Sequence, residues 1–515
     1  MPPANLDWLT YKVSFGFGGL NGSPNLDVVP PEAFIPFSKN LNNHAGGREK
    51  RGGTTIAGTV TGASKVLRIF QFRKIDGTVQ TITHDVSGTV YKDYSTSVRT
   101  GRAVTGYSDF LYYRDTGYFV DGANAPQTYD GTTMADLTNL AADWTGSNFP
   151  AKLFKHGRGA SERLWALRTP GFLDSLYYSA NGSNNFSTGG KLRIDTGDAF
   201  GIVAAEEFGR QIIALGKSRP YVVLDEDAST ANWGYEPAQF TGGCANQNLL
   251  VRTPNDLISM MPDGEIFSVA AAQEYGDYRS ASIARPAYIH RWIEENVNLT
   301  RIDQFHAIYD PALRCVYFFM IYTGEERVRH ALTFFIDRDP KEAWTVHDNL
   351  SNPSGFEAVC AHVFFDSAGR TTVHTGADTG KVWKLGQTVK SDNSLGFPFV
   401  IRTPQLTIDN PRETKLFRAV RLTTNPKGNY DLVMEWWVDG VSQGTKTLTT
   451  SAIGGAYNSA VYNTSIYGGQ EIGELFAELG QVGKRIQFEF RNSTAGEDFF
   501  ISELMVDFEP LGARY

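Results

Sequence analysis

Three clusters of acidic residues could take part in glycoside hydrolysis, because that chemistry needs two carboxylates facing one pocket. The clusters are Asp225, Glu226 and Asp227; Glu206 and Glu207; and Glu294 and Glu295. The first cluster follows the apolar run YVVL and is expected on a loop, where calcium is conceivable. Paired acids on exposed turns or helix faces are more often solubilising, so we assign no catalytic role to these clusters.

Other catalytic and metal-binding patterns are absent from the sequence. The nine histidines form neither H-x-H nor H-E-x-x-H. His362 and His374 lack cysteine or carboxylate partners at metal spacing, so zinc is not expected. No G-x-S-x-G elbow is present to anchor a serine hydrolase. We therefore predict no catalytic, cofactor-binding or metal-ligating residue and no cofactor.

A basic, glycine-rich stretch, NLNNHAGGREKRGGT, concentrates positive charge near the start of the chain. It could be a phosphate cradle, a nucleic-acid patch or an arm that docks on another subunit. The stretch lacks the G-x-x-x-x-G-K-[ST] pattern of a phosphate loop. It also lacks local aromatic residues on which single-stranded bases could stack. We therefore favour a docking or solvated loop.

The composition is that of a globular chain rich in strands and turns. The 515 residues include 48 basic and 56 acidic residues, and this net charge of −8 argues against a general nucleic-acid binder. Aromatic residues make up 13% and glycine supplies 52 residues, which favours many short strands. Cys244, Cys315 and Cys360 are expected to be buried free thiols. Neither a signal peptide nor a membrane-spanning run is expected.

Residues 1–60 are expected to form an extended N-terminal arm. They are rich in glycine, proline and asparagine and lack hydrophobic periodicity. Pro30 and Pro31 favour an extended course, and a short helix after them is limited by Pro36. Such a segment has little core of its own and must lie on a neighbouring surface. We expect the chain to fold without residues 1–54 but to fail in assembly.

Residues 61–390 predict a β-propeller-like domain. Strand–turn–strand units such as FLYYRDTGYFVDG and RLWALRTPGFLDSLYYS recur about every 40 to 55 residues, the spacing of propeller blades. About six such units are expected. YYSANGSNNFSTGG resembles the Asp-box hairpin of sialidase-type propellers, with Asn181 in place of the usual aspartate and Phe186 returning to the apolar layer. One helix is expected at RPAYIHRWIEENV, with Ile289, Trp292 and Ile293 on one face.

Residues 391–515 predict a β-sandwich domain. In RIQFEF, Ile486, Phe488 and Phe490 alternate with polar residues, as in a sheet packed on one side. KSDN at 390–393 is the expected linker. Strand alternation places only one of Trp436 and Trp437 toward the core.

The order of these elements resembles the tail nozzle or hub proteins of short-tailed bacteriophages. FHAIYDPALRCVYFF and the final FFISELMVDFEPLGARY resemble a later strand pair and the C-terminal domain of that family. The opening residues that carry the resemblance are Gly18 to Asn21, Asn40 or Asn42, Lys50, Arg51, Gly53 and Thr54, with Gly52 in place of the usual proline.

The resemblance implies a structural virion protein without enzymatic activity. It implies a homo-oligomeric ring of about six copies that extends the DNA conduit below the portal and the head-to-tail adaptor. Expected partners are other copies, the adaptor, other tail proteins or fibres, and passing genomic DNA without sequence-specific binding; no membrane is involved. The ring would be assembled in the host cytoplasm. We expect its inner wall to be net negative or neutral and the basic loop to dock on a neighbour.

Two carbohydrate-related alternatives remain open. A sialidase-like or tailspike-like propeller would need arginines and acids gathered at one mouth. The candidate arginines are Arg163, Arg168, Arg193, Arg210 and Arg219. A carbohydrate-binding tip protein could instead use Trp436 and Trp437 of the sandwich as a sugar platform.

Overall fold

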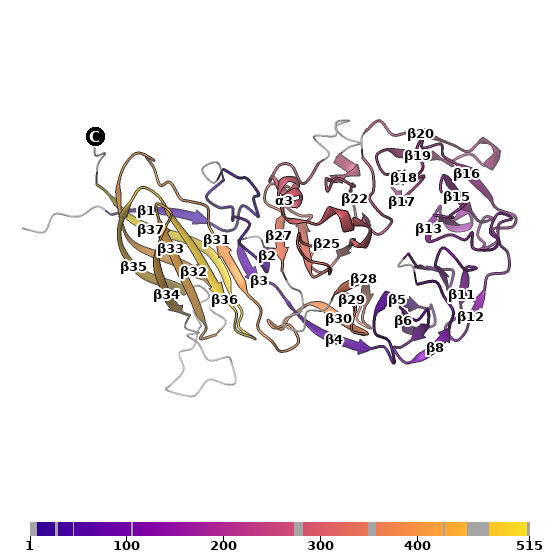
Figure 1. The fold of residues 1–515 in the computed structure, drawn as a ribbon, viewed down its shortest axis with the longest axis horizontal. Helices are drawn as coiled ribbons and strands as arrows, with labels where there is room; N and C mark the ends of the chain where they lie inside the picture. The colour runs from indigo at the N-terminus through magenta and orange to yellow at the C-terminus, as the bar shows by residue number, and fades with distance from the viewer. Residues whose placement is uncertain are drawn as a thin grey trace, which may run out of the picture.

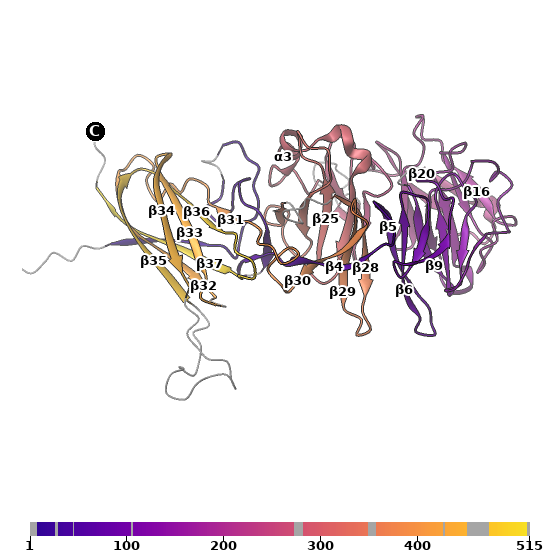
Figure 2. The ribbon, with the colours of Figure 1, turned by 60° about the horizontal axis from the view of Figure 1, so that its bottom comes forward.

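The protein consists almost entirely of short antiparallel strands arranged in two domains that lie side by side (Figures 1 and 2). One domain is a β-propeller and the other is a two-sheet sandwich, which confirms the predicted all-β class. The computed structural model describes residues 8–25, 29–44, 46–104, 107–240, 242–271, 282–348, 357–425, 428–450 and 473–511.

The described residues of the propeller form seven sheets, where about six units were predicted. Their first strands are neighbours around a closed circle. The first three blades are β5 (Val66–Arg73), β6 (Val79–Asp85), β7 (Val90–Lys92) and β8 (Thr96–Arg99); β9 (Asp109–Tyr113), β10 (Thr116–Val120), β11 (Gln127–Tyr129) and β12 (Met134–Asp136); and β13 (Lys152–His156), β14 (Arg163–Leu167), β15 (Ser175–Tyr178) and β16 (Gly190–Arg193).

The remaining four blades complete the circle. They are β17 (Ala204–Phe208), β18 (Gln211–Leu215), β19 (Pro220–Leu224) and β20 (Gly234–Pro237); β21 (Leu250–Arg252), β22 (Leu257–Met260) and β23 (Ile266–Ser268); β24 (His306–Asp310), β25 (Cys315–Met320), β26 (His330–Phe335) and β27 (Trp344–His347); and β28 (Ala358–Phe365), β29 (Thr371–Ala377), β30 (Lys381–Gln387) and β4 (Gly53–Thr59). Every residue of β25 and β26 is buried, because neighbouring layers cover both faces of the sixth blade.

The last blade is closed by the N-terminal part of the chain. β4 pairs antiparallel with β30, although more than 300 residues separate them in sequence. This corrects the expected domain boundary at residue 60, since β4 is the outer strand of a blade. Full pairing of a blade leaves no open seam in the circle of sheets.

The sandwich packs a six-stranded sheet against a four-stranded sheet. The larger sheet contains β1 (Leu9–Ser14), β2 (Leu41–His44), β3 (Gly47–Lys50), β32 (Lys415–Thr424), β35 (Gly473–Gly483) and β37 (Phe500–Pro510). The smaller contains β31 (Phe399–Arg402), β33 (Asp431–Val438), β34 (Val441–Thr449) and β36 (Ile486–Asn492). Ile486, Phe488 and Phe490 are buried between the sheets, which confirms the predicted inward face.

The N-terminal segment is built into both domains of its own chain. β1 and β3 pair with β37 of the sandwich, whereas β4 closes the propeller. The expectation that residues 1–54 can be removed without loss of the fold does not agree with this arrangement. Such a truncation would remove three sandwich strands and the start of the closing strand.

The predictions for the helix and for the three cysteines are confirmed. α3 (Ile289–Asn296) buries Ile289, Trp292 and Ile293. It packs on the propeller and against the N-terminal segment, where Gly22 N–H donates to the Ala287 carbonyl at 2.9 Å. Short 3-10 turns lie at Gly159–Ser161, Thr230–Asn232 and Leu299–Gln304. All three cysteines are buried and unpaired. Within the described ranges, every helix is too short or too polar to cross a membrane.

Candidate functional site

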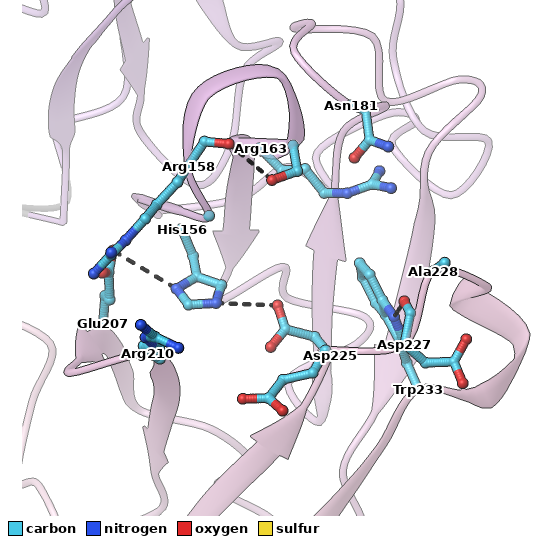
Figure 3. A pocket seen from close by; sticks show the side chains of 13 residues that line it. His156, Arg158, Arg163, Asn181, Glu207, Arg210, Asp225, Asp227, Ala228 and Trp233 are labelled. Carbon is cyan, nitrogen blue, oxygen red and sulfur yellow. Dashed lines mark hydrogen bonds and ion pairs between the residues drawn. The ribbon is translucent and has the colours of Figure 1, made fainter.

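A group of charged and polar side chains surrounds a hollow of about 490 Å³ between the third and fourth blades (Figure 3). Its walls are the loops that follow β13, β15, β17 and β19. In antiparallel blades the first and third connections lie at the same end, so these loops meet at one mouth of the propeller. The lining residues used below are His156, Arg158, Arg163, Asn181, Glu207, Arg210, Asp225, Glu226, Asp227 and Trp233.

His156 joins the two blades at the floor of the hollow. Its Nε2 lies 3.2 Å from Asp225 Oδ2, and its Nδ1 lies 3.6 Å from Glu207 Oε2. Burial lowers the pKa of His156, but the hydrogen bond and charge of Asp225, with the charge of Glu207, raise it above its ordinary value overall. The His156 side chain thus brings the end of β13 next to two carboxylates of the fourth blade.

Asp227 and Arg163 are occupied by structural contacts. Asp227 accepts hydrogen bonds from the Ser229 backbone N–H at 2.7 Å and from Asn232 Nδ2 at 3.0 Å, which shapes its loop. The Arg163 guanidinium lies 5.1 Å from the centroid of the Trp233 ring, and Trp233 stacks on Trp165. Trp233 therefore has contacts with an arginine and a second indole and offers no clear aromatic platform.

Arg158, Arg210, Glu226 and Asn181 have exposed side chains that line the hollow. In the described parts of the chain, none of these four side chains forms a hydrogen bond or ion pair. In Figure 3, Arg210 is drawn below His156 and to the left of Asp225. The site therefore combines two cationic groups, one free carboxylate and one amide.

The structure brings together only part of what the sequence suggested. Of the five candidate arginines, Arg163 and Arg210 line the hollow. Arg168 donates to the Phe200 carbonyl, Arg193 pairs with Asp174, and Arg219 is exposed on another turn. His156 and Arg158 were not singled out, because no sequence pattern marks a histidine whose partners come from the next blade.

The remaining candidate acids and histidines lie elsewhere. Glu294 and Glu295 are on the exposed side of α3. Glu206 points to the axis of the propeller, where Arg252 Nη1 lies 3.6 Å away. His362 and His374 are paired across β28 and β29, and burial lowers the pKa of His362 to about 4. Within the described residues, no three histidine, cysteine or acidic side chains are grouped as metal ligands.

Charged residues of both signs lie on the first strands of neighbouring blades, near the axis of the propeller. Asp109 and Lys152 form an ion pair of 3.2 Å, and Glu206 and Arg252 form the next pair. These four residues come from four consecutive blades, β9, β13, β17 and β21. Acidic and basic side chains therefore alternate over these four blades, and Arg68 of β5 adds a further basic group to the cavity lined by Asp109 and Lys152.

The basic loop is buried inside its own chain and is not free to dock on a neighbour. Arg51 forms a bidentate pair with Asp392, with Nη1–Oδ1 at 3.0 Å and Nη2–Oδ2 at 2.6 Å. Lys50 Nζ donates to Asn492 Oδ1 at 3.0 Å, and burial lowers the pKa of Lys50 to about 8. Arg48 donates to the carbonyls of residues 17 and 18. The expectation of an intermolecular docking loop is therefore wrong for these side chains.

The expected linker is also part of this buried cluster. Asp392 is fully buried, and Lys390 pairs with Glu49 at 2.8 Å and with Asp498 at 3.1 Å. The 390–393 segment thus joins the domains through paired charges, and it is not a solvated spacer. The sequence pattern missed this because the partners of Lys390 are distant along the chain.

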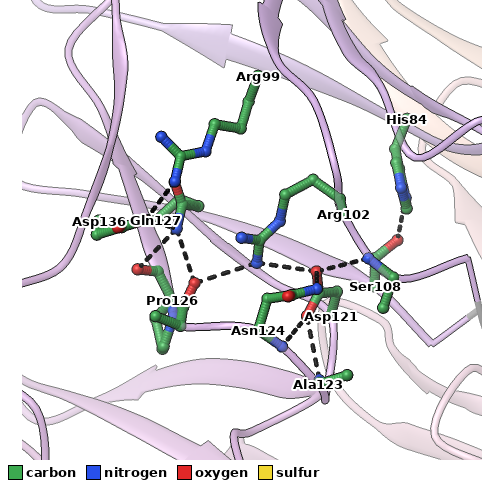
Figure 4. Close-up of polar contacts among 12 residues, drawn as sticks. His84, Arg99, Arg102, Ser108, Asp121, Ala123, Asn124, Pro126, Gln127 and Asp136 are labelled. Atoms are coloured by element: carbon green, nitrogen blue, oxygen red, sulfur yellow. Dashed lines mark hydrogen bonds and ion pairs between the residues drawn. The ribbon is translucent and has the colours of Figure 1, made fainter. Parts of the chain in front are cut away.

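Another buried ion pair stabilises the connection between the first two blades (Figure 4). Arg102 Nη2 lies 2.8 Å from Asp121 Oδ2, and both side chains are almost inaccessible. Asp121 also accepts hydrogen bonds from the backbone N–H groups of Ala103 and Asn124. Both oxygens of the Asp121 carboxylate thus have partners in the surrounding structure, and we assign the cluster a structural role.

The proposed sugar platform of the sandwich is covered. Trp436 is buried in the core, and Trp437 is partly exposed, as strand alternation predicted. The Arg402 guanidinium lies 4.2 Å from the centroid of the Trp437 ring. A sugar would have to displace this cation to stack on that face.

Comparisons with known proteins give no family for the chain. No family model matches it, and no curated protein matches its sequence. Among solved structures it is similar to BBS1N in complex with ARL6DN, at 8% identity and a TM-score of 0.41 over 66% of this chain and 98% of that one. It is also similar to the N-terminal domain of Nup159, at 9% identity and a TM-score of 0.37, over 72% of this chain and 98% of that one. An exo-beta-1,3-galactanase from Phanerochaete chrysosporium matches at 9% identity and a TM-score of 0.25, over 78% of this chain and 95% of that one. Similarities this low carry no functional argument.

Proposed function

We propose that this chain is a structural protein of a bacteriophage tail, which forms the ring of a nozzle or hub below the portal and adaptor. The observation that carries the proposal is the N-terminal segment, which is a strand donor to both domains. A tail component must keep its contact surfaces in fixed positions, and a segment shared by two domains limits their relative movement. The resemblance of the opening residues to nozzle and hub proteins supports the same function.

The buried charges at the domain junction favour this function over one that needs an open hinge. Lys39 Nζ pairs with Asp348 of the propeller at 2.7 Å, while its backbone N–H donates to Val400 of the sandwich at 2.9 Å. Together with the Arg51–Asp392 pair, this contact fixes the propeller and sandwich through the same segment. The Lys39 side chain is 35% exposed, whereas Arg51 and Asp392 are almost inaccessible, so the buried pair constrains this segment most.

Electron microscopy of the purified full chain at high concentration, alone and with the cognate adaptor, tests the proposal. We expect closed rings of about six copies, and their attachment to adaptor rings. Antibodies against the chain should label the tails of intact virions. A protein that stays monomeric under all these conditions and is absent from purified virions would contradict the proposal.

A second candidate function is carbohydrate binding by the propeller, which the hollow beside His156 favours. Hydrolysis is less well supported, because a glycosidase needs two available carboxylates. Asp225 is engaged by His156 Nε2 at 3.2 Å, and Glu207 lies 3.6 Å from Nδ1 of the same ring. A polysaccharide depolymerase assay with the full chain separates the two activities, and we expect no turnover.

A further inference from the structure

The hollow between the third and fourth blades contains charged groups that the fold itself does not use. Asp227 and Arg163 have structural partners, as described above. Arg158 and Arg210 instead expose guanidinium groups that have no partner among the described residues, and both line the same hollow. The carboxylates that line the same hollow are those of Glu207, Asp225, Glu226 and Asp227, and neither arginine is within ion-pair distance of any of them among the described residues.

The floor of the hollow supplies a fixed polar surface. The His156 side chain is only 9% exposed and is held at Nε2 by Asp225. Its buried Nδ1 has no hydrogen-bond partner within normal distance, since Glu207 lies 3.6 Å away. A buried polar atom that lacks a close partner at the base of a hollow is a position where a bound polar group gains a hydrogen bond.

Three classes of small ligand can be compared against these groups. A bare inorganic anion would meet Arg158 and Arg210 but would also face the carboxylates of Glu207, Asp225 and Glu226. A neutral sugar would satisfy the carboxylates with its hydroxyl groups but would leave both guanidiniums unpaired. A ligand with one carboxylate and several hydroxyls matches both sets of groups.

We propose that this hollow binds an acidic saccharide, with the sugar carboxylate at Arg158 and Arg210 and its hydroxyls at Glu226 and Asn181. Arginine is suited to this role because its planar guanidinium binds carboxylates through paired hydrogen bonds. A volume of about 490 Å³ is within the usual range for a small-ligand pocket.

The proposal rests on the second candidate function, carbohydrate binding, and is independent of tail assembly. The third and fourth blades lie at the end of the propeller away from the sandwich (Figure 1). The buried contacts of the N-terminal segment with Asp348 and Asp392 lie at the opposite end. Variants in the hollow can therefore be tested for ligand binding and for ring formation separately.

Isothermal titration of the full chain with D-glucuronic acid, D-glucose and inorganic phosphate tests the proposal. We expect D-glucuronic acid to bind at least about tenfold more tightly than either D-glucose or phosphate. Arg158→Met and Arg210→Met should each weaken glucuronate binding by about tenfold or more. Arg219→Met is the matched control, because Arg219 is an exposed arginine of the fourth blade that does not line the hollow.

Each of several results would overturn the proposal. Equal binding of phosphate and glucuronate would indicate a general anion site, and equal binding of glucose would show that the arginines are not used. Loss of binding in Arg219→Met to the same degree as in Arg158→Met would also exclude this location. Thermal unfolding of each variant shows whether it is folded, and ring formation by the same variants should be unchanged. A loss of rings would bear on the tail function and not on the saccharide site.

Discussion

Arg51 lies in the interior of the molecule, with a side chain that is 2% exposed, and its charge is balanced by Asp392, which is 0% exposed. The guanidinium also lies 3.9 Å from the centroid of the Phe397 ring. A buried pair of this kind does not necessarily stabilise a protein relative to apolar residues, but removal of one partner leaves an uncompensated buried charge. The pair therefore fixes which surfaces of the N-terminal segment and the 390–393 segment meet.

Asp392→Asn should lower the free energy of unfolding by about 3 to 5 kcal/mol, because Arg51 would stay buried without its counter-charge. Urea unfolding at neutral pH measures the change. Glu503→Gln is the control, since the Lys12–Glu503 pair is exposed and its loss should cost less than about 1 kcal/mol. Equal effects of the two substitutions would show that the Arg51–Asp392 pair is not important for stability.

At the residue scale, sequence patterns predicted which apolar side chains are buried better than they predicted which residues contact one another. Phe186 and Trp436 are buried as their patterns indicated. Local spacing could not show that Asp225 and Glu207 would both meet His156, because strand periodicity says which way a side chain points and not which blade lies beside it. The basic loop was misassigned for the same reason: Arg51 and Asp392 are separated by more than 300 residues.

At the scale of elements, the closing strand β4 passes so near the 390–393 segment that only glycine fits at its start. A Cβ added to Gly53 would lie 2.0 Å from the Ser391 carbonyl oxygen. Gly53 N–H also donates to the Val389 carbonyl at 2.7 Å. The glycine thus allows the closing strand and the segment between the domains to be in direct backbone contact.

Gly53→Ala should destabilise the protein by about 1 to 3 kcal/mol, because the added methyl group forces these two backbones apart. Differential scanning calorimetry measures the expected fall in melting temperature. Gly234→Ala is the matched control in β20, where a Cβ would meet no atom within 4 Å. Its effect should stay within about 0.5 kcal/mol. A tolerated Gly53→Ala together with a destabilising Gly234→Ala would contradict the role of this contact.

The strand pairs were largely predictable from the sequence, but the closure of the last propeller blade by β4 was not. Alternation and turn residues located the strand pairs of the blades and the inward face of β36, because both depend on local periodicity. The pairing of β4 with β30 has no local signal, since Gly53–Thr59 reads as one more short strand. The sequence consequently predicted a separate arm where the structure has a shared strand donor.

At the scale of the whole molecule, five histidines are buried in their neutral form. Burial is the main cause that lowers the pKa to about 4 for His84 and His362, and to about 3 for His306, His347 and His374. An unfolded chain would bind protons at these positions with a pKa near 6.5. Below that pH, the unfolded state therefore binds more protons than the folded state.

The free energy of unfolding should fall as the pH drops from about 6.5 toward 4, by up to about 1.4 kcal/mol per pH unit for each of these histidines. His156 acts in the opposite direction, because its pKa is raised, but it is one group against five. Urea unfolding at several pH values between 7.5 and 4.5 checks the trend. His374→Gln should reduce the change in the free energy of unfolding per pH unit by the contribution of one histidine. A free energy of unfolding that does not change over this range would refute the expectation.

The shared N-terminal segment also determines when the molecule can be completed during synthesis. β1 and β4 are synthesised long before their partners, because β37 and β30 lie about 490 and 330 residues further along the chain. At about 5 to 20 residues per second, the first strand waits roughly 20 to 100 s for its partner. Throughout that time its hydrogen-bonding edge is open to other nascent chains on the same polysome. Slow translation, or a shortage of chaperones, should therefore reduce the yield of native protein more than it would for a propeller closed by adjacent strands.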